Sequence, residues 1–336
     1  MSMILMRGIL QQARNFQYPP TSQPHVYVAG NADSTNGNKT VRKFTTEGIE
    51  VNIQNPITND SAVGLSLLSG IAVDSNGNIY VVGTRTAITD YGHASMIKYD
   101  SNGSIVWVKD HGSNLNCITI VDDLIYVGGE TVSGVSMRKY NAEGDQLLTL
   151  DHGITQRAVF VDTVGNIYIG GGRRYINWQI GHANLRKFNS SGTEQWIRDT
   201  GVAGSSINDI FVDDNFNVYA VGTVANGASL RKYNSAGTPQ FTRNHGATVF
   251  AICSDGTSIY ISGDPVDNIT TRQYSYAGVS GWTYDHGFFL RGSYCDNNTI
   301  YLCGTGITHR VIALNTNGTL TWGVFVGNTL SGITVK

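Results

Sequence analysis

The chain has 336 residues, of which 40 are glycine and only 14% are charged, whereas an average soluble protein carries about 7% glycine and about 25% charged residues. Its 23 basic and 25 acidic side chains leave a net charge of −2, which excludes a general electrostatic binder of nucleic acid. The 40% apolar content is enough for a folded core, and no apolar run approaches the roughly 18 residues of a membrane-spanning helix.

Residues 1–24 do not follow the repeat that fills the rest of the chain, and they contain an apolar series at partly helical spacing. The series is Met3, Ile4, Leu5, Met6, Ile9 and Leu10. Arg7 breaks any signal-peptide core, and Pro19-Pro20 separates this segment from the first strand. A closed repeat fold offers these side chains no obvious place in its own core. We therefore expect residues 1–24 to be a docking arm for assembly with a second subunit or another protein.

From His25 onwards, a strand-like phrase that ends in glycine occurs seven times. The copies are VYVAG from Val26, IYVVG from Ile79, IYVGG from Ile125, IYIGG from Ile167, VYAVG from Val218, IYISG from Ile259 and IYLCG from Ile300. Successive copies begin 41 to 53 residues apart. This is the period of the four-stranded blades of a propeller.

Each repeat contains four short runs rich in Val, Ile and Tyr, which we call strands A to D. In the second repeat, strand A is GIAVD from Gly70, strand B is the phrase above, strand C is MIKY from Met96, and strand D surrounds Trp107. Every C–D connection crosses a glycine: Gly48, Gly103, Gly144, Gly192, Gly237, Gly278 and Gly318. We expect these glycines to close tight hairpins at positive φ, where glycine has no steric cost.

The A–B connection often reads Asp-x-x-Gly-Asn, as in residues 74–78 and 162–166. Asp and Asn side chains accept backbone hydrogen bonds in such turns. A calcium loop is the alternative interpretation, but later copies lose acidic groups that calcium would require. We therefore interpret these segments as turns and expect no metal site.

The first repeat begins at strand B, and the chain ends with a strand A, residues 331–336, that no further strand follows. If this last strand joins the N-terminal blade, the ring closes and no strand edge is left open. The sequence therefore predicts an all-β fold. It is a single seven-bladed β-propeller over residues 25–336, with four-stranded antiparallel blades and the ring closed by the C-terminal strand.

Residues 70–84, GIAVDSNGNIYVVGT, are followed by SMIKYDSNGSIVWVKDHG from Ser95. Together they resemble the bacterial beta-propeller repeat that is often found in secreted and surface proteins and in some phage proteins. The resemblance covers residues 25–336 and implies the fold, but it implies almost nothing about activity. The chain also resembles the Trp-containing repeats of quinone-binding propellers, although it lacks their longer docking motif.

In a propeller, the A–B and C–D turns share one face, here called the tight-turn face, and the B–C and D–A loops share the other, here called the loop face. The longest loop-face segments are 54–69, 85–94 and 172–183. Variable loops on a rigid scaffold commonly form a binding surface. The candidate ligand-binding residues are Tyr91, His93, Tyr175, Trp178 and His182, because such rings stack on sugars or anchor protein interfaces. In the alternative interpretation, these rings pack on their own loops.

Two further patterns recur with the blade period. Asp-His-Gly stands at the D–A junction in residues 110–112, 151–153 and 285–287. We expect a turn there rather than a metal site, because imidazoles on different blades are too far apart to share an ion. Arg-Lys pairs occur in strand C at 42–43, 138–139, 186–187 and 231–232. Adjacent strand residues point to opposite faces, so we expect these charges to pair with the recurrent Asp residues rather than to form a basic patch.

The four cysteines, Cys117, Cys253, Cys295 and Cys303, lack metal-binding spacing. A turn at residues 297–299 would place Cys295 opposite Tyr301 and Cys303 opposite Ser293, so these two cysteines would not meet. We therefore expect buried thiols and a fold that does not depend on disulfides.

No nucleophile elbow, zinc-protease motif or phosphate-binding loop occurs in the sequence. We expect a non-enzymatic binding or structural propeller without a cofactor. The composition resembles that of surface proteins, yet no export signal is evident, and a phage particle reconciles the two because it assembles in the cytoplasm and leaves by lysis. We therefore favour a virion component, tail- or capsid-associated, that contacts other virion proteins through its arm and that has glycans as potential ligands. The alternatives are a secreted or cell-surface carbohydrate-binding propeller and a propeller enzyme with a site built from loops.

Overall fold

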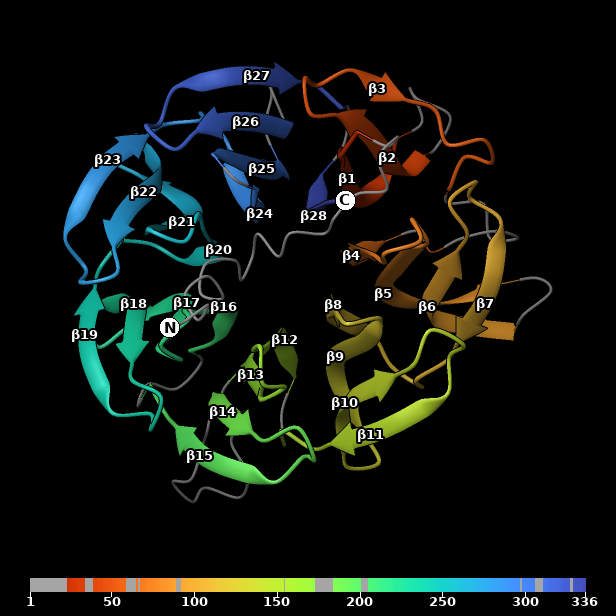
Figure 1. Cartoon of the computed structure of the whole chain (residues 1–336), viewed down its shortest axis with the longest axis horizontal. Coiled ribbons are helices and arrows are strands. Elements are labelled where there is room, and N and C mark those ends of the chain that lie inside the picture. Colours follow the sequence, from red (N-terminus) through yellow and green to blue (C-terminus); the bar gives the residue numbers. More distant parts are fainter. Residues whose placement is uncertain are drawn as a thin grey trace, which may run out of the picture.

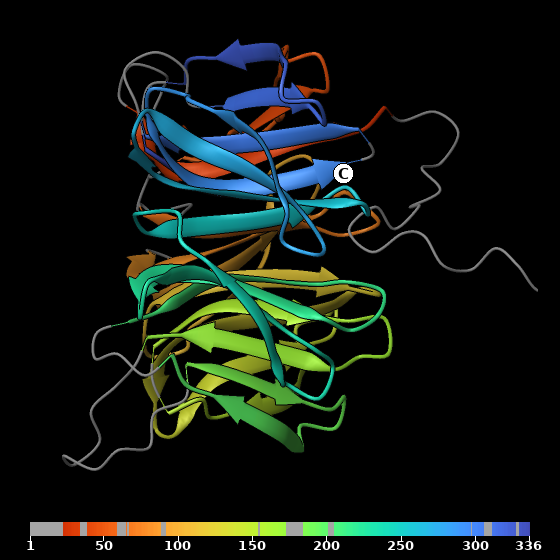
Figure 2. The same cartoon turned by 90° about the vertical axis from the view of Figure 1, so that its left-hand side faces the viewer.

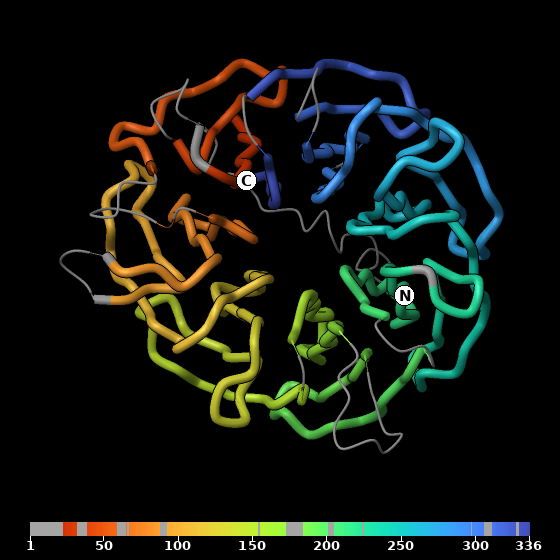
Figure 3. The backbone as a smooth tube through the Cα atoms, turned by 180° about the vertical axis from the view of Figure 1, so that it is seen from behind, coloured from red at the N-terminus to blue at the C-terminus, as the bar shows by residue number. Residues whose placement is uncertain are grey.

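The computed structural model describes residues 23–33, 39–58, 65, 67–88, 92–153, 155–172, 184–200, 205–296, 298–305, 311–326 and 329–336. Within these ranges all named elements are β-strands, and they form seven four-stranded antiparallel sheets. The sheets are arranged as blades around a central channel (Figures 1 and 3). The prediction of a seven-bladed propeller is confirmed.

In each blade the innermost strand is A and the outermost is D. Blade 1 contains β28 (Leu330–Val335), β1 (His25–Asp33), β2 (Lys39–Thr45) and β3 (Glu50–Val51), and blade 2 contains β4 (Leu68–Val73), β5 (Ile79–Ile88), β6 (Gly92–Tyr99) and β7 (Ile105–Lys109). Blade 3 contains β8 (Leu115–Val121), β9 (Leu124–Val132), β10 (Val135–Tyr140) and β11 (Gln146–Leu150), and blade 4 contains β12 (Gln156–Val161), β13 (Ile167–Gly171), β14 (Leu185–Phe188) and β15 (Glu194–Arg198).

The second half of the ring repeats the same order. Blade 5 contains β16 (Ile207–Val212), β17 (Val218–Ala225), β18 (Ala228–Tyr233) and β19 (Pro239–Arg243), and blade 6 contains β20 (Val249–Ser254), β21 (Ser258–Val266), β22 (Ile269–Ser275) and β23 (Ser280–Tyr284). Blade 7 contains β24 (Phe289–Asp296), β25 (Thr299–Thr305), β26 (Val311–Asn315) and β27 (Leu320–Val324). Seen from the side, the strands run between two faces, where the connections gather (Figure 2).

The ring is closed by the last strand, as the sequence predicts. β28 pairs antiparallel with β1, with Val28 opposite Ile333. The backbones of His25 and Lys336 exchange two hydrogen bonds of 2.7 and 2.9 Å. Blade 1 therefore consists of both ends of the described chain, and its core packs against that of blade 7.

The A–B turns have the Asx chemistry that the sequence predicts. Asp74 Oδ1 accepts hydrogen bonds from the backbone N–H groups of Asn76 and Asn78, each at 2.9 Å, and Asp74 Oδ2 accepts from the Tyr80 hydroxyl at 2.9 Å. Asp162 and Asp213 make the same set of contacts in blades 4 and 5. The carboxylate oxygens are thus occupied by turn and strand donors, which confirms the turn interpretation.

The C–D glycines all have positive φ, between 77° and 88°, which confirms the predicted hairpins. They also serve as docking points for the preceding blade. A Cβ added to Gly318 would lie 2.7 Å from the Trp282 ring, and one added to Gly48 would lie 2.8 Å from the Trp322 ring. The glycine is therefore required twice, by its backbone angle and by the ring that lies against it.

Strand C lysines and strand D tryptophans act together as latches between blades. Lys98 Nζ and Trp107 Nε1 both donate to the carbonyl oxygen of Ala142 in the next blade, at 2.8 and 3.3 Å. Lys187 and Trp196 reach Ser235 in the same way, and Trp322 donates to Thr46 at 2.6 Å across the closure. These blades are therefore tied to their neighbours near the rim of the tight-turn face.

Lys187 and Lys232, from the Arg-Lys pairs, interact electrostatically with the recurrent Asp162 and Asp213, but within the described residues they make no direct ion pair with them. The Lys98 and Lys187 ammonium groups lie 5.2 Å from the ring centres of Tyr80 and Tyr168, and carbonyl oxygens accept their hydrogen bonds. The Asp carboxylates are already occupied within their own turns, so the cation–π contact and the neighbouring carbonyl take their place. Burial lowers the pKa of Lys187, as this half-buried position predicts.

The Asp-His-Gly junctions form turns, as predicted. Asp110 Oδ1 accepts a hydrogen bond from the Gly112 N–H at 2.8 Å, and the His111 N–H donates to Ser95 Oγ at 3.2 Å. The same serine or threonine acceptor serves the other three junction histidines, His152, His245 and His286. All four imidazoles are buried, each in its own blade. The junction thus fastens the end of strand D to the start of strand C.

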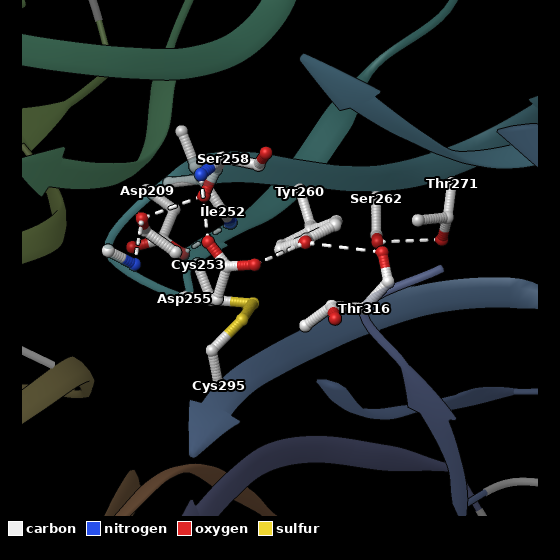
Figure 4. The surroundings of a disulfide bond; sticks show 12 residues. Asp209, Ile252, Cys253, Asp255, Ser258, Tyr260, Ser262, Thr271, Cys295 and Thr316 are labelled. Carbon is white, nitrogen blue, oxygen red and sulfur yellow. Dashed lines mark hydrogen bonds between the residues drawn. A yellow bond between two sulfur atoms is a disulfide. The ribbon is translucent and has the colours of Figure 1, made fainter. Parts of the chain in front are cut away.

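A disulfide links Cys253 of β20 to Cys295 of β24, with the two Cα atoms 5.7 Å apart (Figure 4). This corrects the expectation of a fold without disulfides. The two cysteines are separated by 42 residues, one blade period, so the bond joins the inner strands of neighbouring blades. The predicted hairpin register was also wrong by one residue, since Cys303 pairs with Gly292 and Cys295 with Ile300. Cys117 and Cys303 are free thiols.

Candidate functional site

Every inner strand contains a β-bulge at the same height. In blade 2, Leu68 pairs with Gly83 and Gly70 pairs with Val82, so that Ser69 between them is left unpaired. The equivalent unpaired residues of the seven blades are Ser331, Ser69, Asn116, Arg157, Asn208, Phe250 and Arg291, in order around the ring. We call these seven residues the bulge ring. Bulges redirect side chains and are common beside binding sites.

The bulge explains the glycine that ends each strand B phrase. The seven glycines are Gly30, Gly83, Gly129, Gly171, Gly222, Gly263 and Gly304. A Cβ added to any of them would lie closer than 3.0 Å to a backbone carbonyl oxygen of the inner strand, a separation that real Cβ atoms essentially never show. The bulged strand approaches its neighbour so closely that only glycine fits opposite it.

All seven residues of the bulge ring line one cavity of about 710 Å³ at the mouth of the channel, here called the funnel. The funnel opens on the loop face, because each inner strand starts directly after a D–A loop. Asn116 Nδ2 donates to the Gln156 carbonyl and Asn208 Nδ2 to the Val249 carbonyl, both at 2.9 Å and both in the next blade. These two amides therefore brace neighbouring blades at the funnel wall.

Two arginines occupy opposite parts of the funnel wall, three blades apart. Arg157 is exposed, and its side chain makes no hydrogen bond or ion pair with any residue that the structure describes. Arg291 lies over the Phe250 ring, with its guanidinium carbon 3.9 Å from the ring centre. Arg291 Nη1 lies 3.5 Å from Asp264 Oδ1 and makes no hydrogen bond within the described part of the chain.

Asp209 is an acidic group at the floor of the funnel. The other blades have Gly, Ala or Cys at its position. Asp209 Oδ1 accepts from the N–H of Ile210, and Asp209 Oδ2 accepts from the N–H of Ile252 in the next blade, each at 2.9 Å (Figure 4). Burial raises the pKa of this carboxyl to about 7, because desolvation outweighs the two donated hydrogen bonds.

The channel continues below this floor as a smaller cavity of about 270 Å³, which reaches the tight-turn face. Lys336, Asp74 and Asp123 lie at its outer end. Burial lowers the pKa of Lys336 to about 8, while the carboxylates of Asp74 and Asp123 oppose that change. Both ends of the channel therefore carry charged side chains.

The structure places few of the residues that the sequence singled out. Tyr91, Tyr175, Trp178 and His182 lie outside the described residues. His93 is exposed in β6 and does not line the funnel. The segment 85–94, expected as a loop, is largely an extension of the β5–β6 hairpin, in which Ala87 pairs with His93.

The arm residues, Met3, Ile4, Leu5, Met6, Ile9 and Leu10, also lie outside the described residues, and so their role stays a prediction. Within the described ranges no helix is long and apolar enough to cross a membrane. The same ranges contain no cluster of three or more His, Cys, Asp or Glu side chains that would suit a metal ion.

The bulge ring itself escaped the sequence prediction, although a signal for it was present. A glycine inside a strand pattern often marks a bulge or a close backbone approach, and this glycine occurs in all seven copies. The unpaired residue opposite it is the second residue of the inner strand in six blades and the third in blade 7.

Comparison with known proteins supports the fold. Residues 69–84 match the family model described as "Beta-propeller repeat", and a search of curated proteins gave no match. Among solved structures, the WD40 beta propeller domain of Doa1 is similar at TM-score 0.59 and 13% identity, covering 82% of this chain and 88% of that one.

Two further solved structures are similar. The computationally designed Ika8 protein has TM-score 0.55 and 14% identity over 84% of this chain and 77% of that one. BamB from Moraxella catarrhalis has TM-score 0.52 and 16% identity over 92% and 84%. At these identities the likeness concerns the fold alone. The chain is therefore a seven-bladed β-propeller, and its second blade carries a sequence match to the beta-propeller repeat family.

Proposed function

We propose that this propeller is a non-enzymatic binding component of a phage virion, attached through residues 1–24 and presenting its loop face to a ligand. The observation that carries the binding role is the difference between the two faces. On the tight-turn face, turn donors and acceptors satisfy one another within the blades. On the loop face, the bulge ring directs one side chain from each blade into an open funnel.

The state of the nucleophilic and basic groups supports a binding role over catalysis. Burial raises the pKa of the Cys303 thiol to about 12 and also raises that of Cys117, which disfavours the reactive thiolate. The four junction histidines are buried and their pKa values are lowered. Neither kind of group lies at the funnel mouth in a form suited to attack a substrate.

The virion setting rests on the sequence, which combines surface-type composition with an apolar arm. Immunogold labelling with an antibody against the propeller tests it on particles purified from a lysate of the source organism. We expect labelled particles, and we expect that a chain lacking residues 1–20 folds but is not incorporated. Purified particles without label would contradict the virion role, and normal incorporation of the shortened chain would contradict attachment through the arm.

A secreted or cell-surface carbohydrate-binding propeller is the second candidate. The arginines and the phenylalanine of the bulge ring favour it, because such groups recognise the acidic and apolar parts of sugars. Immunoblots of washed cells and of cell-free medium, before lysis, separate the two settings. Protein present on intact cells would favour this candidate, whereas protein that appears only with released particles would favour the virion.

A further inference from the structure

We propose that the funnel binds a carboxylate-bearing sugar of the uronic-acid class. This deepens the proposed function and rests on the binding role stated there. The seven bulge positions are structurally equivalent, yet they hold two serines, two asparagines, two arginines and one phenylalanine. The residue before the bulge is aliphatic in six blades, and the residue after it is Gly, Ala or Cys in six. Variation among the copies is thus concentrated on the side chains that face the funnel.

The bulge ring side chains fall into two groups: some hold neighbouring blades together, and others are exposed to the cavity. Asn116 and Asn208 brace neighbouring blades through carbonyl oxygens. The side chains of Ser69, Arg157 and Ser331 make no hydrogen bond or ion pair with the part of the chain that the structure describes. A guanidinium and two hydroxyls therefore face the cavity with their donors available to a ligand.

The acidic groups of the funnel do not neutralise Arg157. Asp209 is held by the backbone N–H groups of Ile210 and Ile252. The Glu130 carboxylate accepts a hydrogen bond from Asn114 Nδ2 at 3.2 Å. Arg157 thus offers a planar, permanently charged fork to the cavity, and the group that matches such a fork in two parallel hydrogen bonds is a carboxylate.

The opposite wall is aromatic. Arg291 lies over Phe250 and its guanidinium carbon is 6.0 Å from the centre of the Phe289 ring. Phe289 is 47% exposed at the start of β24. Flat aromatic faces pack against the apolar face of a sugar ring. A cavity of about 710 Å³ falls within the roughly 300–1,000 Å³ of small-molecule sites and has room for a monosaccharide or disaccharide.

Together these groups define how a ligand would sit in the funnel. The sugar carboxylate pairs with Arg157, ring hydroxyls reach Ser69 and Ser331, and the apolar face of the ring lies toward Phe250. A simple anion would use only the first of these contacts, and a neutral sugar would use only the others. The ligand that uses all of them carries both a carboxylate and a pyranose ring.

Isothermal titration with D-glucuronate tests this on the full chain, with glucose, acetate and inorganic phosphate as comparison ligands. We expect glucuronate to bind at least about tenfold more tightly than each of the other three, since a charged hydrogen bond contributes about 1.5–3 kcal/mol. Arg157→Gln should weaken glucuronate binding about tenfold to a hundredfold and remove its preference over glucose. Arg85→Gln, an equal charge change outside the funnel, should leave the binding unchanged.

Four results would overturn the inference: no binding at about 10 mM glucuronate, equal binding of glucose, equal binding of phosphate, or unchanged affinity in Arg157→Gln. Melting temperatures confirm that Arg157→Gln is folded, which its exposed side chain predicts. The virion role is tested separately by particle labelling. If particles are labelled but the protein does not bind glucuronate, only the ligand proposal is refuted. If the protein binds glucuronate but is absent from particles, only the virion role is refuted.

Discussion

Acidification from pH 7 to pH 5 should destabilise the propeller strongly, because four buried histidines resist protonation. Burial lowers the pKa of His111, His152 and His286 to about 3 and that of His245 to about 4. The usual histidine pKa is about 6.5. Between these values the unfolded chain binds protons that the folded chain does not, so the free energy of unfolding falls as the pH drops through this window.

The magnitude follows from the number of protons. Each histidine contributes about 1.4 kcal/mol per pH unit once the unfolded chain is protonated. Four histidines, less the one proton that folded Asp209 retains, give about 4 kcal/mol per pH unit between roughly pH 6 and 4.5. This is large beside a typical total stability of about 5–15 kcal/mol. Urea unfolding curves at pH 7, 6 and 5, followed by tryptophan fluorescence, measure it, and a free energy of unfolding that is the same at pH 7 and pH 5 would refute the reasoning.

A pair of histidine variants sharpens the test. Neither ring nitrogen of His152 has a hydrogen-bond partner among the described residues. His152→Phe should therefore keep the stability at pH 7 and reduce the pH dependence by one proton. His111→Phe breaks hydrogen bonds of 2.8 Å to Ser95 and to Tyr140, so it should lose about 1–3 kcal/mol at pH 7.

Three further changes probe the architecture. Gly171→Ala forces a Cβ against the Thr155 carbonyl oxygen and should lower the free energy of unfolding in urea by about 1–3 kcal/mol. The neighbouring Gly172→Ala, whose Cβ would have its nearest atom 4.0 Å away, should lower it by less than about 0.5 kcal/mol. Equal losses in the two variants would contradict the bulge explanation. Replacing Cys253 and Cys295 together by Ala should lower the free energy of unfolding by about 2–4 kcal/mol and abolish the effect of a reductant on stability. Four titratable thiols in the denatured wild-type chain would show instead that no disulfide forms. Deleting residues 332–336 removes most of β28 and exposes Val26 and Val28, so circular dichroism should show loss of the cooperative melting transition; an unchanged melting temperature would contradict closure by this strand.

The sequence predicted those features that recur locally within each repeat. The strand order, the seven blades and the closure follow from the copy count, and the C–D glycines and A–B aspartates follow from turn chemistry. The turn features depend on residues a few positions apart, whose geometry is set by local backbone and side-chain chemistry.

Contacts between blades were not predicted, because the repeat pattern does not indicate which residues of successive copies come into contact. Lys187 was expected to pair with an Asp, yet Asp162 is occupied by its own turn and by Tyr168, and Lys187 donates instead to the Ser235 carbonyl of the next blade. Cys253 and Cys295 stand at different positions of their strands, so their meeting depends on the stagger between blades. The bulge ring was missed because the carbonyl that excludes a Cβ at Gly83 belongs to Leu67, directly before the neighbouring strand of the same blade, and the sequence does not show how closely two strands approach.

Asp209 departs from the repeat more than any other residue at its level of the channel, and its titration carries a prediction of opposite sign to that of the histidines. Its folded pKa of about 7 lies above the usual value of about 3.9. The contribution of the protonated carboxyl to stability is therefore fully present below about pH 4 and is lost as the pH rises toward 7.

Asp209→Asn removes this titration, and its single amide oxygen can accept from only one of the two backbone N–H groups of Ile210 and Ile252, a loss of about 1–3 kcal/mol at every pH. Relative to the wild-type chain, the variant should therefore gain stability as the pH rises from 4 to 8, by at most about 4 kcal/mol. Urea unfolding at pH 8 and pH 5 measures both arms. A difference in stability that is the same at pH 8 and pH 5 would contradict the raised pKa of Asp209, and the floor of the funnel would then carry a full negative charge at both pH values.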